Sequence, residues 1–134
     1  RKERFVTLDD YTVFDTQIKL MWASEDNGEN INWVDAKSYC ENFRGGGYSD
    51  WRLPTLEELA GLYDDSLAGY EQACGSKFGW VKLTDSIYIT CCCVWASEMD
   101  GSRAEYFNFH SGNWNYKSPS NHAAQRALPV RSAK

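Results

Sequence analysis

The feature that most constrains the fold of this sequence is a sharply marked helix start near its middle. Pro54 stops the extended segment before it, and Thr55 and Glu58 have the spacing of a capping box, in which each residue satisfies a backbone amide of the other. The apolar side chains that follow have helical spacing: Leu56, Leu59, Ala60 and Tyr63. We therefore predict a helix from about Leu56 to Asp64.

A second helix is predicted earlier in the chain. Asn32 is a suitable N-cap after the turn cluster Asn27 to Asn30, and the glycines 45 to 47 end the segment. The apolar positions recur at helical spacing: Trp33, Ala36, Cys40 and Phe43. On this pattern, Cys40 is a small buried side chain.

Runs of β-branched and aromatic residues on both sides of the helices predict strands. The first runs form a hairpin between Phe5 and Trp22. The later runs are Trp80 to Leu83, Ile87 to Trp95, Tyr106 to Phe109, Gly112 to Asn115 and Ala127 to Arg131. This order of elements predicts an α+β fold with two helices and a small, mostly antiparallel sheet.

The length of 134 residues suits one domain that spans residues 1–134. The hydrophobic content of 43% is too high for a disordered chain, yet no apolar run approaches the roughly 18 residues needed to cross a bilayer. We expect no membrane insertion by this domain. The start at Arg1 lacks the apolar stretch of a signal peptide, but the chain can be one module of a longer protein, so the compartment stays open.

The charge of the chain is unevenly distributed. The formal net charge is −5, yet residues 101–134 carry five basic side chains and one acidic side chain, Glu105. These cations are not clustered as on a nucleic-acid-binding face, so we expect no nucleic-acid partner. An anionic ligand stays open.

Five cysteines make an odd count, which argues against a disulfide framework, although a bridge from Cys74 stays open. Cys91 to Cys93 are neighbours in a predicted strand, where they alternate between faces and cannot converge on one metal ion. A zinc site would need His110 and His122 as distant partners, without any close-spaced ligand pair. We therefore predict no metal, and small apolar strand residues are one interpretation of the triplet.

The segment Gly46-Gly47-Tyr48-Ser49-Asp50-Trp51-Arg52-Leu53-Pro54-Thr55-Leu56-Glu57-Glu58-Leu59 resembles the signature of the Lcl C-terminal domain family, formerly a domain of unknown function. Further motifs extend the resemblance over nearly the whole chain: Asp15-Thr16, Leu20-Met21-Trp22, Trp33, Ala36 to Cys40, Trp95-Ala96-Ser97-Glu98 and Pro129-Val130-Arg131. Lys19 and Leu128 depart from the family pattern, which often has glycine and arginine there. These departures concern local turn geometry.

The resemblance implies a C-type-lectin-like fold and a binding module borne on a cell surface or a virion tail, as in adhesins and in variable proteins that retroelements diversify. It implies recognition, with no catalytic residue and no cofactor. The motif residues themselves look structural. Asp50 and Arg52 flank Trp51, so the ring can point inward while the charges pair with backbone or with each other.

The genetic code offers a further hypothesis about the C-terminal third. Mutated adenines turn an asparagine codon into codons for Cys, His, Ser, Tyr, Arg, Ala, Asp or Gly, but never for Trp, Lys, Gln, Glu or Met. The residues outside the reachable set would have to be constant: Trp95, Glu98, Met99, Glu105, Trp114, Lys117 and Gln125. Many reachable residues lie between them, which is compatible with diversification by a retroelement and equally with ordinary polar loops.

We predict that polar and cysteine positions of this third form the ligand-binding surface, because Tyr gives rigid contact area and Ser and Asn give adaptable hydrogen bonds. The candidate residues are Cys91, Cys92, Cys93, Asp100, Ser102, Arg103, Tyr106, Asn108, His110, Ser111, Asn113, Asn115, Tyr116, Ser118, Asn121 and His122. Trp95, Phe107 and Phe109 are assigned to the core, and Trp114 is assigned there in preference to a stacking platform. The expected partner is a protein or glycan receptor on another cell or surface.

Two alternatives use the same region differently. An adhesin domain would bind one fixed glycan or glycosaminoglycan, in a mode that weakens as salt rises. Calcium is not expected, because Asn113-Trp114-Asn115 lacks the companion Glu-Pro-Asn or Gln-Pro-Asp element of true C-type lectins. Arg52-Leu53-Pro54-Thr55 also resembles the formylglycine-generating enzyme family, whose thiol chemistry would fall to Cys91 and Cys93. The sequence shows no cationic or metal environment for these thiols, so we expect no enzyme.

Overall fold

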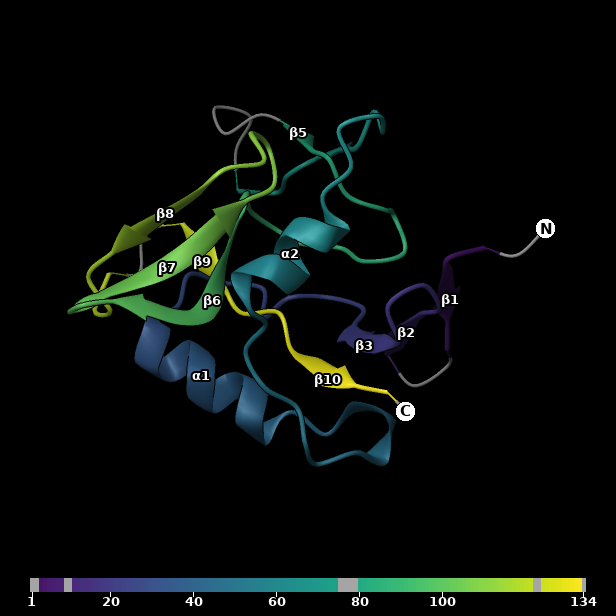
Figure 1. Cartoon of the computed structure of the whole chain (residues 1–134), viewed down its shortest axis with the longest axis horizontal. Coiled ribbons are helices and arrows are strands. Elements are labelled where there is room, and N and C mark those ends of the chain that lie inside the picture. Colours follow the sequence, from purple (N-terminus) through teal and green to yellow (C-terminus); the bar gives the residue numbers. More distant parts are fainter. Residues whose placement is uncertain (1–2, 9–10, 75–79, 122–123, 134) are drawn as a thin grey trace.

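Two four-stranded β-sheets lie on either side of a short helix, α2 (Figure 1). The structure, a computed structural model, describes residues 3–8, 11–74, 80–121 and 124–133. The helices are α1 (Trp33–Asn42), the 3-10 turn η1 (Gly45–Gly47) and α2 (Leu56–Leu62). The strands are β1 (Phe5–Thr7), β2 (Thr12–Asp15), β3 (Leu20–Ala23), β4 (Tyr70–Glu71), β5 (Trp80–Val81), β6 (Cys93–Asp100), β7 (Arg103–Asn108), β8 (Trp114–Lys117), β9 (Gln125–Arg126) and β10 (Val130–Ser132). The predicted α+β fold with two helices is confirmed.

The last two strands belong to different large sheets, so the chain passes from one sheet to the other between β9 and β10. The first sheet has the order β1-β2-β3-β10, the second has the order β8-β7-β6-β9, and β4 and β5 form a small third sheet. Among the described strands, every pair is antiparallel except β6 with β9. The strand predicted from Ala127 to Arg131 is therefore wrong in its first part, and only Val130 and Arg131 belong to a strand, β10. Pro129 cannot donate a ladder hydrogen bond, and the Ala127 amide donates to Asn27 Oδ1 at 2.8 Å instead.

Helix α1 begins where the sequence predicts. Asn32 Oδ1 accepts a hydrogen bond from the Asp35 amide at 2.8 Å, as an N-cap does. Cys40 is fully buried on the inner face of the helix, and Trp33 donates through Nε1 to the Ala96 carbonyl oxygen at 2.8 Å. These contacts attach α1 to strand β6 (Figure 1).

Helix α2 begins at the predicted capping box. Thr55 Oγ1 accepts from the Glu58 amide at 3.1 Å, and Glu58 Oε1 accepts from the Thr55 amide at 2.9 Å. Arg52 donates to both carboxylate oxygens of Glu58, each at 2.9 Å. The helix ends at Leu62, slightly earlier than predicted, because Tyr63 has an extended backbone.

Trp51 and the charged residues on either side of it also hold the fold together. Trp51 is buried and donates through Nε1 to the Gly45 carbonyl oxygen at 3.1 Å, so the inward direction of its ring is confirmed. Asp50 does not pair with Arg52. Its carboxylate accepts from Arg131 of β10, with Nε at 2.6 Å from Oδ1, so the two charges beside Trp51 tie the motif to two different elements.

The Arg52–Glu58 pair should make stability depend on acid pH. Burial opposes ionisation of Glu58, but hydrogen bonds from Arg52 and Thr55 and the positive charge of Arg52 outweigh it and hold the pKa of the carboxyl below its ordinary value of 4.5. A depressed folded-state pKa contributes stability above the unfolded pKa and loses it as pH falls through the folded pKa. Urea unfolding should therefore lose more stability between about pH 5 and pH 3 in the wild type than in Glu58→Gln.

Glu57 offers the matched control for this prediction, because it lies on the same helical turn and its side chain is exposed. Glu57→Gln should keep the wild-type slope of stability against pH. Equal slopes for Glu58→Gln and the wild type would contradict the assigned role of the ion pair.

Strand β6 starts at Cys93, so the strand predicted from Ile87 to Trp95 is wrong in its first half. The residues before Cys93 form a loop that is held by side chains. Asp26 accepts hydrogen bonds from the amide of Thr90 at 2.7 Å and from its hydroxyl, and Arg126 Nε donates to that hydroxyl oxygen at 2.7 Å. Tertiary contacts thus override the local strand propensity.

The core has two parts. One lies between the two large sheets around α2 and contains Phe107 and Phe109; the other lies between α1 and β6 and contains Trp95. The core assignment of these three aromatic residues is confirmed. Within the described ranges, no helix has the length and apolar character to cross a membrane.

Lys19, one of the two departures from the family pattern, lies in the turn between β2 and β3. Its φ is 58°, in the left-handed region. A glycine adopts this conformation without steric strain, whereas an L side chain does not. The turn therefore keeps a glycine-like geometry despite the lysine.

Candidate ligand-binding surface

The cysteine triplet lies inside the protein. Cys91, Cys92 and Cys93 are 1%, 1% and 3% exposed. Cys91 forms a disulfide with Cys74, and Cys92 forms one with its neighbour Cys93. The expectation that these residues contribute to an exposed surface is therefore wrong, as is the argument from the odd count against a disulfide framework. The unpaired thiol is Cys40, and burial raises its pKa.

Strand β8 lies at the edge of the second sheet and extends beyond the core. Residues opposite one another in an antiparallel pair point to the same face. Phe107 pairs with Trp114, and Glu105 pairs with Tyr116, so these four side chains share one face. Phe107 is buried against the core, whereas Trp114 is 63% exposed. The preference for a core position of Trp114 is wrong, because nothing in the described structure covers the edge strand there.

Arg103 lies on the same face as Trp114 and Tyr116. Its guanidinium carbon is 3.6 Å from the centre of the Tyr116 ring, a cation–π contact. The Asp100 carboxylate accepts from Arg103 Nη2 at 3.2 Å across the hairpin tip. We call Arg103, Trp114 and Tyr116 the aromatic strip. It presents two exposed rings and one stacked cation on a single face.

The turn between β7 and β8 is fixed by short-range hydrogen bonds. Asn108 Oδ1 accepts from the amides of His110 at 2.8 Å and Ser111 at 3.2 Å. Gly112 has a φ of 79°, and a Cβ there would come within 2.7 Å of the Tyr63 ring, so only glycine fits. Asn108 therefore shapes the turn, while His110 and Ser111 are exposed on it.

Two other candidates lie on the opposite face of the hairpin. Tyr106 pairs with Asn115 and packs edge-on against Trp95, with ring centres 6.0 Å apart. Burial raises the pKa of the Tyr106 hydroxyl. Lys117 Nζ lies 5.8 Å from the centre of the Tyr106 ring. This face packs toward α1, on the side of the hairpin away from the aromatic strip. The predicted ligand-binding residues therefore do not form one continuous surface.

The remaining candidates are dispersed. Ser102 is exposed at the hairpin tip, and Asn113 is exposed in the β7–β8 turn. Ser118 and Asn121 form a turn near the start of α1, where the Asn121 amide donates to the Ser118 carbonyl oxygen at 2.9 Å. His122 lies outside the described residues. Within the described part of the chain, no group of three or more His, Cys, Asp or Glu side chains is placed to hold a metal ion.

Sequence reasoning missed two exposed aromatic residues next to this surface. Trp114 is part of the aromatic strip, and Trp80 of β5 is 49% exposed and lies beside the turn, where its carbonyl oxygen is 3.0 Å from His110 Nδ1. Alternation along Tyr106 to Phe109 shows which residues of β7 share a face with Phe107, and the pairing of Phe107 with Trp114 puts Trp114 on that face as well. Alternation does not show that the core ends before β8.

These features define an α+β domain whose exposed C-terminal hairpin carries aromatic, cationic and amide side chains on a disulfide-bonded framework. The model of the Lcl C-terminal domain matches residues 11–131, so the chain belongs to the Lcl C-terminal domain family. No curated protein matches this chain.

Proposed function

We propose that this protein is a non-enzymatic binding domain that recognises a protein or glycan receptor through the aromatic strip and the exposed residues of the β7–β8 turn. The observation that carries the proposal is the exposure of Trp114 and Tyr116 beside Arg103, on a hairpin whose Phe107 ring is buried. Large exposed aromatic side chains and arginine are enriched at the centres of binding interfaces. The family resemblance to a C-type-lectin-like binding module supports the same function.

The architecture of the hairpin supports this proposal. Phe107 anchors β7 in the core, and the hydrogen bonds of Asn108 and the fit of Gly112 against Tyr63 hold the turn. A rigid framework lowers the conformational entropy that contact residues lose on binding. Tyr, Ser and Asn side chains then provide contact area and hydrogen bonds at the surface.

The state of the cysteines favours binding over thiol chemistry. The oxidase-like alternative needs Cys91 and Cys93 as a reactive pair, but each forms a disulfide with a different residue. Cys40 is buried, and its raised pKa disfavours the thiolate that would act as a nucleophile. We therefore propose no catalytic role for these side chains.

Diversification by a retroelement is part of the proposal in a narrower form. The candidate residues that are both exposed and reachable are Asp100, Ser102, Arg103, His110, Ser111, Asn113, Asn115, Tyr116 and Ser118. The cysteines are omitted, because variation there would break buried disulfides. Sequencing of the surrounding locus tests this part: it requires a near-repeat of the coding segment that differs chiefly at template adenines, and a reverse transcriptase. Their absence would leave a fixed ligand.

A fixed anionic glycan is the second candidate ligand, in an adhesin borne on a cell surface or virion as part of a larger protein. The stacked Arg103 favours it, because a cation beside exposed rings suits both the apolar faces and the acidic groups of such a glycan. Binding of this kind should weaken steeply as salt rises, whereas a contact dominated by the rings should not.

The binding proposal can be tested with an array of neutral, sialylated and sulfated glycans and a display library of cell-surface protein domains. We expect saturable binding to at least one class, weakened about tenfold or more by Trp114→Ala combined with Tyr116→Ala. Val34→Ala is the control, since Val34 is an exposed apolar residue on α1. Binding that survives the double substitution unchanged would refute the assigned surface.

A further inference from the structure

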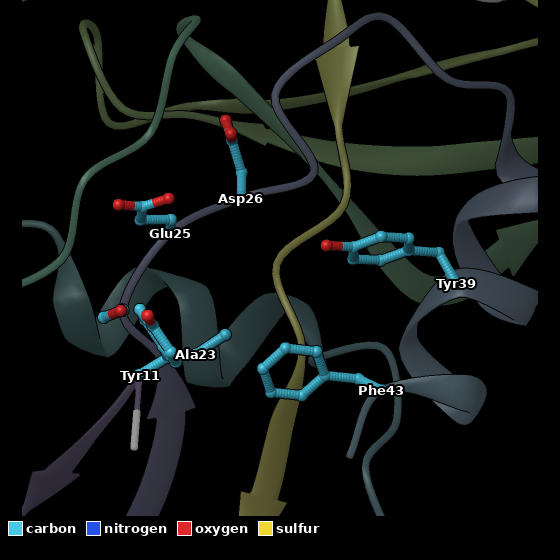
Figure 2. A pocket seen from close by; sticks show the side chains of 7 residues that line it. Tyr11, Ala23, Glu25, Asp26, Tyr39 and Phe43 are labelled. Carbon is cyan, nitrogen blue, oxygen red and sulfur yellow. The ribbon is translucent and has the colours of Figure 1, made fainter. Parts of the chain in front are cut away.

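A small pocket lies between the segment that follows β3 and the C-terminal half of α1 (Figure 2). Its volume is about 150 Å³. Three aromatic and two acidic side chains line it: Tyr11, Tyr39, Phe43, Glu25 and Asp26. The aromatic strip does not contribute to it, so the pocket is a separate site.

The two carboxyl groups of the pocket differ in their surroundings, and burial raises the pKa of the Asp26 carboxyl. Asp26 is buried and fixed by hydrogen bonds from the Thr90 amide at 2.7 Å and the Gly28 amide at 2.9 Å. Arg126 Nε is 3.9 Å from the Asp26 carboxylate and donates to Thr90 Oγ1. Glu25 is exposed, and within the described residues its carboxylate has no hydrogen bond or ion pair. Glu25 is therefore available to a ligand that carries a positive charge.

The aromatic walls are held in place by the backbone and by packing. Phe43 packs edge-on against Trp51, with ring centres 4.7 Å apart. Tyr11 has a φ of 66°, a strained conformation for a bulky residue, and its carbonyl oxygen accepts from the Ser24 amide at 3.0 Å beside the pocket. Such strain persists where the surroundings impose it and occurs often at ligand sites.

Tyr39 completes the pocket from the side of α1. Figure 2 shows its hydroxyl directed into the space between α1 and the Glu25–Asp26 segment. Burial, together with the nearby Cys40, Asp26 and Glu25, raises the pKa of this hydroxyl. The ring therefore stays neutral and presents an electron-rich face.

We propose that this pocket binds the quaternary or methylated ammonium group of a small organic cation. Aromatic faces attract such groups through cation–π interactions, and a carboxylate at the rim adds a charge partner without requiring a hydrogen-bond donor. A cavity of this size accommodates a group about as large as benzene, which a trimethylammonium group matches. A metal ion fits the site less well, because hard cations require more oxygen ligands than two carboxylates supply.

Choline is the probe for this proposal, and its carbon isostere, in which carbon replaces the charged nitrogen, is the matched neutral control. Titration of each into the whole domain, followed by NMR of the Tyr39 and Phe43 ring protons, should show saturable choline binding in roughly the millimolar range. The isostere should bind at least about fivefold more weakly. Equal binding of both compounds, or no saturation with choline, would overturn the proposal.

Variants separate the pocket from a general effect of charge. Glu25→Gln should weaken choline binding about fivefold, and Glu29→Gln, which changes an exposed carboxylate outside the pocket, should leave it unchanged. Tyr11→Gly removes one ring at a position where glycine suits the backbone, so it should weaken binding without unfolding the protein. Equal losses in Glu25→Gln and Glu29→Gln would show nonspecific attraction and refute the site.

Discussion

Replacement of Trp95 by alanine is expected to lower the free energy of unfolding by about 3–5 kcal/mol, one of the largest effects of any single substitution in this protein. Trp95 is completely buried between α1 and β6, and its Nε1 donates to the Ile31 carbonyl oxygen at 2.7 Å. Alanine would leave a cavity and an acceptor without its donor. Equilibrium unfolding in urea measures the change.

Trp114→Ala is the control for this prediction, because the same side chain is removed from an exposed position of the same sheet. Its effect on the free energy of unfolding should stay within about 0.5 kcal/mol. Similar losses in the two variants would contradict the division of this sheet into a buried framework and an exposed edge strand.

Removal of the Cys74–Cys91 disulfide should destabilise the protein by about 3 kcal/mol. The bridge links residues 17 positions apart, and loss of a loop of that size restores considerable entropy to the unfolded chain. The Cys92–Cys93 bridge joins adjacent residues and constrains the unfolded chain far less, so its removal should cost about 1 kcal/mol. Cys74→Ala with Cys91→Ala, and Cys92→Ala with Cys93→Ala, give the comparison by urea unfolding.

This pair of double variants is well matched, because three of the four cysteines are almost completely buried and alanine replaces each of them. The difference between the two unfolding free energies then reports loop closure. A larger loss for the Cys92–Cys93 pair than for the Cys74–Cys91 pair would contradict the assigned role of the longer bridge.

The helices could be predicted from the sequence because their signals are local. Asn32 caps α1, and Thr55 with Glu58 caps α2, through hydrogen bonds that span three residues. The burial of Phe107 and Phe109 followed from strand alternation for the same reason. Local geometry determines each of these features.

The errors concern features that long-range contacts determine. The segment before Cys93 has strand propensity, but Asp26 holds Thr90 in a loop across 64 positions of the chain. The partner of Cys91 lies 17 positions away, and no spacing rule identifies it. The chain leaves one sheet at Arg126 and joins the other at Val130, which only the arrangement of those sheets reveals.

The candidate surface was predicted in part. Composition indicated the C-terminal third, and Arg103 and Tyr116 do lie in contact on an exposed face. The same reasoning wrongly included the buried cysteines and wrongly assigned Trp114 to the core. The alternation of side chains along a strand shows which residues share a face, but it does not show how far the core extends beneath an edge strand. The burial of the cysteine triplet removes it from the proposed surface, and the exposure of Trp114 adds this residue to it.

The most direct test of the proposed surface is a saturation scan of the whole domain, displayed on a cell surface, with folded display level and binding to the array-identified ligand measured for each variant. The aromatic strip should tolerate substitution for display but lose binding, whereas Trp95, Phe107 and Cys91 should lose display first. Loss of display at the strip, or retained binding in the single variants at each of its three positions, would contradict the proposal that this surface recognises the ligand.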